Sequence, residues 1–135
     1  MKKVFVDSSV LFTAVNSPTG GSAKLFTLTS VQLVTSTLVL TEVERNVRKK
    51  LHDYHLSRFF MLVTQLKIIT QKPKIPLIKK AQKAIVEKDA VILAEAKQAK
   101  ADILVTLDRK HFFTESARNF LRPKKICTPK MILSN

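Results

Sequence analysis

Acidic side chains recur where strands end or helices begin in this sequence, although only ten of its 135 residues are acidic. Asp7 directly follows an apolar run, and Asp108 lies two residues beyond Thr106, at the end of another. Glu42 and Asp89 lie near the starts of helical patterns. Clustered carboxylates repel one another, and a hard cation such as Mg²⁺ or Mn²⁺ offsets that repulsion while accepting oxygen ligands. If the strands are parallel neighbours, these acids form a candidate metal site.

Each acid also has a purely structural interpretation, which the sequence leaves open. Asp7 and Asp89 can each cap the helix that follows, and Asp108 can form a turn. Glu42 can be a solvated helix residue. Asp102 is interpreted first as a cap at the entry to its strand. The acids point to chemistry only when they are taken together.

The apolar pattern predicts short strands that alternate with helices. Strands are expected at residues 4–6, 31–35, 66–70, 103–106 and 125–127. Helices are expected at residues 10–15, 24–30, 37–51, 56–65, 77–87 and 90–100, with loops at 17–21 and 72–76 and a helical turn from residue 129. This alternation predicts an α/β fold with a central parallel sheet covered on both faces. In such folds the site lies beyond the carboxyl ends of the strands.

Length and composition predict one globular domain spanning residues 1–135, with 45% hydrophobic residues and only two glycines. The single cysteine, Cys127, cannot form an internal disulfide, which is consistent with a reducing compartment. No apolar run approaches the roughly 18 residues that a membrane span needs. We therefore expect a soluble cytoplasmic protein.

Positive charge is concentrated in the middle of the chain. The formal net charge is +14, and residues 45–88 carry twelve Lys or Arg residues against Asp53 and Glu87. These cations are either solvated helix faces or a basic collar for a polyanion. Because the excess lies largely outside the acidic stretches, it favours a phosphodiester substrate over a membrane surface.

Other kinds of site have little support in the sequence. One cysteine and three histidines offer no closed zinc ligand set. His52 and His55 are three residues apart, and an exposed polar helix face is the preferred interpretation. There is no glycine-rich phosphate loop and no Gly-x-Ser-x-Gly motif.

Three stretches resemble the PIN-domain family: VFVDSSVLFTAV at 4–15, TSTLVLTEVERNV at 35–47 and KDAVILAEAKQAKADILVTLDRKHF at 88–112. The SPTGG turn and the closing KICTPKMIL segment also look like the toxin branch of toxin–antitoxin systems. The resemblance covers nearly the whole chain and is weakest at 48–87. It implies a three-layer α/β/α sandwich and an endoribonuclease that depends on Mg²⁺ or Mn²⁺.

By position, the resemblance implies that the metal-site and catalytic acids are Asp7, Glu42, Asp89 and Asp108. The supporting residues it implies are Ser9, Thr106 and Asp102. Glu44 is an alternative to Glu42, but the match to VLTEV favours Glu42. The candidate RNA-binding residues are Arg45, Arg48, Lys49, Lys50, Arg109 and Lys110.

The expected partners are RNA, an antitoxin protein and a second copy of the chain in a homodimer. Two alternatives stay open: a catalytically silent PIN-like protein that binds RNA, and a nuclease that acts on DNA or structured nucleic acid. A metal titration distinguishes a live site from a silent one.

Overall fold

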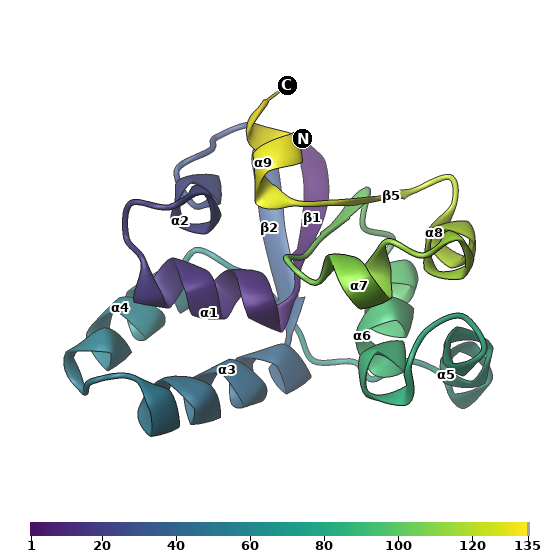
Figure 1. The fold of residues 1–135 in the computed structure, drawn as a ribbon, viewed down its shortest axis with the longest axis horizontal. Helices are drawn as coiled ribbons and strands as arrows, with labels where there is room; N and C mark the ends of the chain where they lie inside the picture. Colours follow the sequence, from purple (N-terminus) through teal and green to yellow (C-terminus); the bar gives the residue numbers. More distant parts are fainter. Residues whose placement is uncertain (135) are drawn as a thin grey trace.

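A parallel five-stranded sheet, in the order β3-β2-β1-β4-β5, forms the centre of the computed structural model, which describes residues 1–134 (Figure 1). The strands are β1 (Lys2–Val6), β2 (Val31–Ser36), β3 (Lys67–Ile69), β4 (Ile103–Val105) and β5 (Lys125–Cys127). All four strand pairs are parallel. The five expected strands are therefore all present.

Helices cover both faces of the sheet. On one side lie α1 (Ser8–Asn16), α2 (Gly21–Leu25), α3 (Thr37–Lys50) and α4 (Tyr54–Val63), which contact one another (Figure 1). On the other side lie α5 (Ile75–Gln82), α6 (Glu87–Gln98), α7 (Arg109–Phe112) and α8 (Glu115–Leu121). The last helix, α9 (Pro129–Leu133), packs against α2. The expected three-layer α/β/α sandwich with a central parallel sheet is confirmed.

The core forms because the central strands are apolar on both faces. Val4, Phe5 and Val6 of β1 are completely buried, as expected for a strand with helices on either side. In α1 the buried residues are Val10, Leu11, Ala14 and Val15, whose spacing matches one face of a helix. Within the described residues, no helix has the length and apolar character needed to cross a bilayer.

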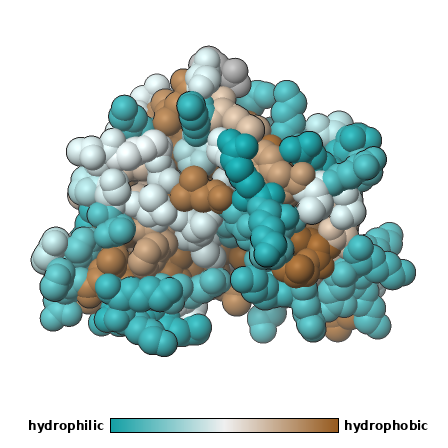
Figure 2. All heavy atoms as spheres, viewed as in Figure 1, coloured by the Kyte–Doolittle hydropathy of each residue, from teal (hydrophilic) through white to brown (hydrophobic). Residues whose placement is uncertain are grey.

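Charged and polar residues coat the surface over both helical layers. In the view of Figure 2, hydrophilic side chains cover the lower left, over α3 and α4, and the lower right, over α5 and α6. A hollow separates these two coated regions. The cation-rich middle of the chain therefore lies on the outside of the molecule, on both sides of this hollow.

The structure corrects several of the expected helices. The helix expected at 24–30 is wrong: α2 begins at Gly21 and ends at Leu25. There, the Thr27 hydroxyl donates to the Lys24 carbonyl, so a side chain replaces the next helical hydrogen bond. Helix α5 begins inside the expected loop, because a proline in the first turn loses no helical hydrogen bond. Helices α7 and α8 were not expected. Each is preceded by a residue whose side chain caps its first turn.

The chain order in the sheet defines where a ligand site belongs. From β1 the chain extends to β2 and β3 on one side, and it later returns to add β4 and β5 on the other. This reversal places a topological switch point between β1 and β4, where α/β proteins bind ligands beyond the carboxyl strand ends. Val6 of β1 pairs with Val105 of β4, so Asp7 and Thr106 leave the sheet side by side.

Glu95 is a buried acid that ties the two helical layers together. It lies on α6 with 6% of its surface exposed, and Ser36 donates a hydrogen bond of 2.7 Å to its Oε1. Ser36 also caps α3 by accepting from the Val39 amide. Burial raises the pKa of Glu95 above its ordinary value, although the Ser36 hydrogen bond opposes this effect.

We expect the effect of Glu95→Gln on the free energy of unfolding to be more favourable at neutral pH than in acid. Because the folded-state pKa of Glu95 is raised, its contribution to stability is greatest below its ordinary value of 4.5 and falls as pH rises through the folded-state value. Glutamine keeps the acceptor oxygen without the charge. Urea unfolding should show the free energy of unfolding of the variant rising relative to that of the wild type as pH increases from below 4.5 to neutrality. A difference that stays constant with pH would contradict this account.

Candidate active site

Asp7 is held in place by hydroxyl groups from two elements. It is 4% exposed and is the residue before α1, but its side chain makes no capping hydrogen bond, so the capping interpretation is wrong. Its Oδ2 accepts from Ser9 Oγ at 2.8 Å and from Thr106 Oγ1 at 2.7 Å. These donors fix one oxygen of the carboxylate, and the other stays available to a ligand.

Ser9 and Thr106 also tie Asp7 to the turn that carries Asp108. The Leu107 amide donates to Ser9 Oγ at 3.0 Å, and the Asp108 amide donates to Thr106 Oγ1 at 3.1 Å. The strand end of β4 and the start of α1 are thus bound together at the switch point. A change in either hydroxyl residue would move two carboxylates.

Asp108 shares its carboxylate with His111. It caps α7 by accepting from the His111 amide at 3.1 Å, and its Oδ2 lies 2.8 Å from His111 Nδ1. Burial raises the pKa of Asp108, but the hydrogen bonds from His111 outweigh it, and the net pKa is lowered. Asp108 therefore stays ionised, and it does form the turn that was one of its interpretations.

Asp89 is buried without a full set of partners. It occupies the first turn of α6, which starts two residues earlier at Glu87, so the interpretation of Asp89 as a helix cap is wrong. Among the described residues, its Oδ2 is the one buried side-chain oxygen or nitrogen without a hydrogen bond, and His111 Nδ1 lies 3.8 Å from it. Burial and then the charge of Asp7 raise the pKa of Asp89, while nearby Lys88 lowers it.

Glu42 reaches the site from the opposite helical layer. Its Oε2 accepts from Ser8 Oγ at 3.1 Å. Glu44, the alternative acid, instead pairs with Arg48 at 3.0 Å on the outer side of α3. The two acids therefore face in different directions, and Glu42 is the one that lines the pocket.

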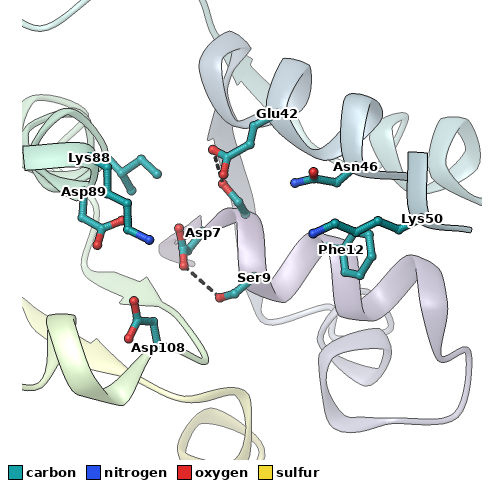
Figure 3. A pocket seen from close by; sticks show the side chains of 11 residues that line it. Asp7, Ser9, Phe12, Glu42, Asn46, Lys50, Lys88, Asp89 and Asp108 are labelled. Carbon is teal, nitrogen blue, oxygen red and sulfur yellow. Dashed lines mark hydrogen bonds between the residues drawn. The ribbon is translucent and has the colours of Figure 1, made fainter. Parts of the chain in front are cut away.

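These acids line one open pocket of about 470 Å³ between α1, α3 and α6. Figure 3 shows Asp7, Asp89 and Asp108 directing their carboxylates toward a common space, with Glu42 approaching from α3. The residues that line the pocket are Asp7, Ser8, Ser9, Phe12, Glu42, Asn46, Lys50, Lys88, Asp89, Ile92 and Asp108. All four expected acids thus meet at the switch point.

Asp102 does not belong to this pocket. The strand β4 separates it from Asp108, so it lies at the opposite edge of the sheet. Its Oδ2 accepts from the Lys3 amide at 2.8 Å, and its Oδ1 pairs with Lys124 at 3.0 Å. The prediction that Asp102 supports the site is therefore wrong. Its interpretation as a cap at the entry to the strand agrees with these contacts.

The expected RNA-binding cations are distributed unevenly around the pocket. Lys50 lines it directly, with its Nζ 6.0 Å from the centroid of the Phe12 ring. Arg48 is engaged by Glu44, and Arg109 lies over the Phe113 ring at 5.6 Å. The remaining candidates, Arg45, Lys49 and Lys110, are exposed.

Among the residues at the site that were not predicted from the sequence are His111, Asn46 and Lys88. His111 lies three residues beyond Asp108, a spacing that joins them across one turn of α7. Asn46 follows Glu42 by four residues and so shares its helix face. Lys88 directs its ammonium group into the space between the carboxylates (Figure 3). The spacings of His111 and Asn46 can be read in the sequence, but only the fold brings these side chains to the pocket.

The donor set fits a hard divalent cation. One ligand atom from each of Asp89, Asp108 and His111 lies within 4.8 Å of the other two. Carboxylate oxygens dominate, which suits Mg²⁺ or Mn²⁺, and the unpartnered Oδ2 of Asp89 is the kind of buried atom that a cation satisfies. A bound cation would also offset the burial and the Asp7 charge that raise the pKa of Asp89.

Comparison with known proteins identifies the family. The family model described as the PIN domain matches residues 4–119. The chain belongs to the PIN domain family. PIN domains are generally nucleases, and the acidic pocket of this PIN domain lies within the matched region.

Two solved structures share the fold of this PIN domain. A chain of VapBC2 from Rickettsia felis, in a structure with a DNA fragment from their promoter, is 17% identical with a TM-score of 0.69, covering 93% of this chain and 98% of that one. PAE2754 from Pyrobaculum aerophilum is 15% identical with a TM-score of 0.66, covering 98% of this chain and 88% of that one. A search of curated proteins finds no match.

We expect Asp89→Asn to stabilise the metal-free PIN domain. The substitution removes one charge from a group of repelling carboxylates. The free energy of unfolding, measured by thermal unfolding in EDTA, should therefore rise by about 0.5–2 kcal/mol. Asp102→Asn is the matched control: its carboxylate accepts from Lys3 and pairs with Lys124, so that variant should lose stability. If metal-free Asp89→Asn protein is less stable than the wild type, the carboxylates do not destabilise the metal-free protein by repulsion.

Proposed function

We propose that this PIN domain is a metal-dependent endoribonuclease that hydrolyses RNA phosphodiesters and acts as the toxin of a toxin–antitoxin pair. The observation that carries the proposal is the convergence of Asp7, Glu42, Asp89 and Asp108 in one open pocket, with a buried oxygen of Asp89 left unpartnered. Cations around this pocket suit a polyanionic substrate.

In this proposal Asp7, Asp89 and Asp108, with Glu42, hold Mg²⁺ or Mn²⁺. When bound, the cation would activate a water and neutralise charge that develops on the phosphate. Ser9 and Thr106 keep Asp7 oriented through their hydrogen bonds to its Oδ2. In the proposed hydrolysis the water oxygen bonds to phosphorus in line as the bond from phosphorus to the leaving ribose oxygen breaks and that oxygen takes up a proton. The 2′-hydroxyl is not the nucleophile, so no cyclic phosphate forms.

Lysines at the pocket wall bind the scissile strand. Lys88 points among the carboxylates, and Lys50 lines the far end of the same pocket (Figure 3). The two lysines occupy different parts of the cavity: Lys88 lies among the acids, and Lys50 lies two helical turns along α3 from Glu42. A phosphodiester strand laid along α3 meets both.

The partners of this PIN domain form the second part of the proposal. The SPTGG turn and the KICTPKMIL segment resemble the toxin branch, and the fold is shared with a chain of the VapBC2 complex. We infer an antitoxin that covers the basic surface and a homodimer of the toxin. Co-purification of the tagged chain from its source cells, followed by light scattering, tests both.

Purified protein should cut single-stranded RNA only when Mg²⁺ or Mn²⁺ is present. Asp7→Asn should lower the cleavage rate by more than about a hundredfold, because loss of even an outer support of a metal ligand costs ten- to a hundredfold. Cleavage is measured on pooled cellular RNAs by gel and end mapping, with EDTA in a parallel reaction.

Glu42→Gln and Glu44→Gln form a matched pair on one helix. The first removes a carboxylate that lines the pocket, and the second removes one that pairs with Arg48 outside it. We expect the first to reduce cleavage and the second to leave it unchanged. Undiminished cleavage in EDTA would overturn the mechanism, while Mn²⁺ binding without any cleavage would favour a silent RNA-binding protein.

A further inference from the structure

Three aromatic rings stack on the surface where α3 turns into α4. The Tyr54 ring lies 4.2 Å from that of His55 and 5.8 Å from that of His52, measured between centroids, with interplanar angles of 28° and 11°. Tyr54 is 71% exposed, so the residue as a whole stays open to solvent beside these neighbours. We call Tyr54, His52 and His55 the corner stack.

The corner stack rests on an ordered support. His55 Nδ1 lies 3.2 Å from the His52 carbonyl oxygen, a contact that orients its ring. Four residues beyond Tyr54, Arg58 Nε donates to the Ala14 carbonyl of α1 at 2.9 Å, which ties α4 to the helix beneath the pocket. The rings therefore lie on a segment that is already joined to α1. Ligand binding should need little further ordering of this segment.

A row of polar side chains connects the acids to this corner. Glu42, Asn46 and Lys50 are spaced four residues apart and so lie on one face of α3, along the pocket (Figure 3). The helix carries this face about 12 Å from Glu42 to Lys50. Since α3 ends at Lys50, the corner stack begins two residues beyond the last residue of the row along the chain, at His52.

The charges of the corner match those of a nucleic-acid backbone. The last turn of α3 carries Arg48, Lys49 and Lys50, and Lys49 and Lys50 are exposed and form no ion pair with any described residue. Asp53 is the one acid in the turn between α3 and α4. Exposed rings interleaved with lysines are the arrangement that binds single strands, with bases stacking on the rings and phosphates meeting the cations.

We propose that the corner stack is a base-binding subsite, in which an unpaired base of a single-stranded nucleic acid stacks on Tyr54 while its backbone runs along α3 to the acids. The inference rests on the proposed nuclease function and deepens it, because it gives the enzyme a preference for single strands. At about 3.4 Å per stacked nucleotide, the row along α3 spans roughly three or four nucleotides. The held base therefore lies several nucleotides from the cleaved bond.

The chain itself contains the probe for this subsite. Tyr54 is its only tyrosine and it has no tryptophan, so intrinsic tyrosine fluorescence reports on the corner stack alone. In the Asp7→Asn protein, which leaves RNA intact, an unstructured single-stranded RNA should quench this fluorescence saturably. An oligomer of the same length with abasic sugars should bind without quenching. RNA and DNA oligomers of one sequence are compared, and quenching by either supports the subsite, because both offer a base and a phosphate.

Substitutions separate stacking from folding. Anisotropy of a labelled strand should show about tenfold weaker binding for Tyr54→Ala and near wild-type binding for Tyr54→Phe, which keeps a ring. Ile75→Ala, which trims a 68% exposed side chain at the start of α5, is the matched control and should bind normally. Lys50→Ala should reduce the slope of log affinity against log salt by about one.

Several results would overturn the subsite. These are single-strand binding that leaves Tyr54 fluorescence unchanged, normal binding by Tyr54→Ala, equal quenching by a blunt duplex, and the absence of any binding. Tyr54 fluorescence that changes only with protein concentration would show that the rings contact a second copy of the chain. That result would also overturn the subsite. The cleavage assay stands apart: metal-dependent cutting that survives Tyr54→Ala unaltered would keep the nuclease and reject the subsite.

Discussion

Burial of the Asp89 carboxylate beside those of Asp7 and Asp108 is the constraint on which this site depends. The parallel sheet brings Asp7 and Asp108 together because Val6 and Val105 are paired at the ends of neighbouring strands. The fold supplies hydroxyl donors to Asp7 and His111 to Asp108, but Asp89 Oδ2 is buried without a hydrogen bond, with His111 Nδ1 3.8 Å away. Under the proposed function a divalent cation would occupy this place, and the protein would give up stability to keep the acids together.

Positive charge completes the site from a different part of the chain. The acids follow the strands at the switch point, whereas the cations lie on helix surfaces such as the end of α3, with Lys88 reaching between the two. This separation lets one pocket attract a polyanion and still concentrate negative charge at its centre. The helix α3 links the halves, because Glu42 and Lys50 occupy the same face two turns apart.

The apolar pattern was enough to predict the sheet, since consecutive buried residues in short strands require a parallel sheet with helices on both faces. The meeting of the acids also needed the strands to be neighbours, which the pattern does not encode, and the resemblance was needed to select the four acids. The resemblance implied a supporting role for Asp102 that is wrong, whereas the pattern of residues placed it at the entry to the strand Ile103–Val105, at the opposite end from Asp108, as the structure shows. His111 and Lys88 were missed because their roles depend on the short turn of α7 and on how α6 approaches the pocket. Helix α2 was misplaced because the Thr27 side chain ends it through a local hydrogen bond that helix periodicity does not encode.

The central claim is that the converging carboxylates form one site for a divalent cation. Anomalous diffraction from crystals of the protein soaked in Mn²⁺ tests it most directly, because the signal locates the ion without any assumption about activity. The account predicts an anomalous peak in contact with the carboxylates of Asp7, Asp89 and Asp108, and its loss in crystals of Asp108→Asn. Well-ordered crystals at saturating Mn²⁺ with no peak at Asp89, or with the same peak retained in the variant, would contradict it.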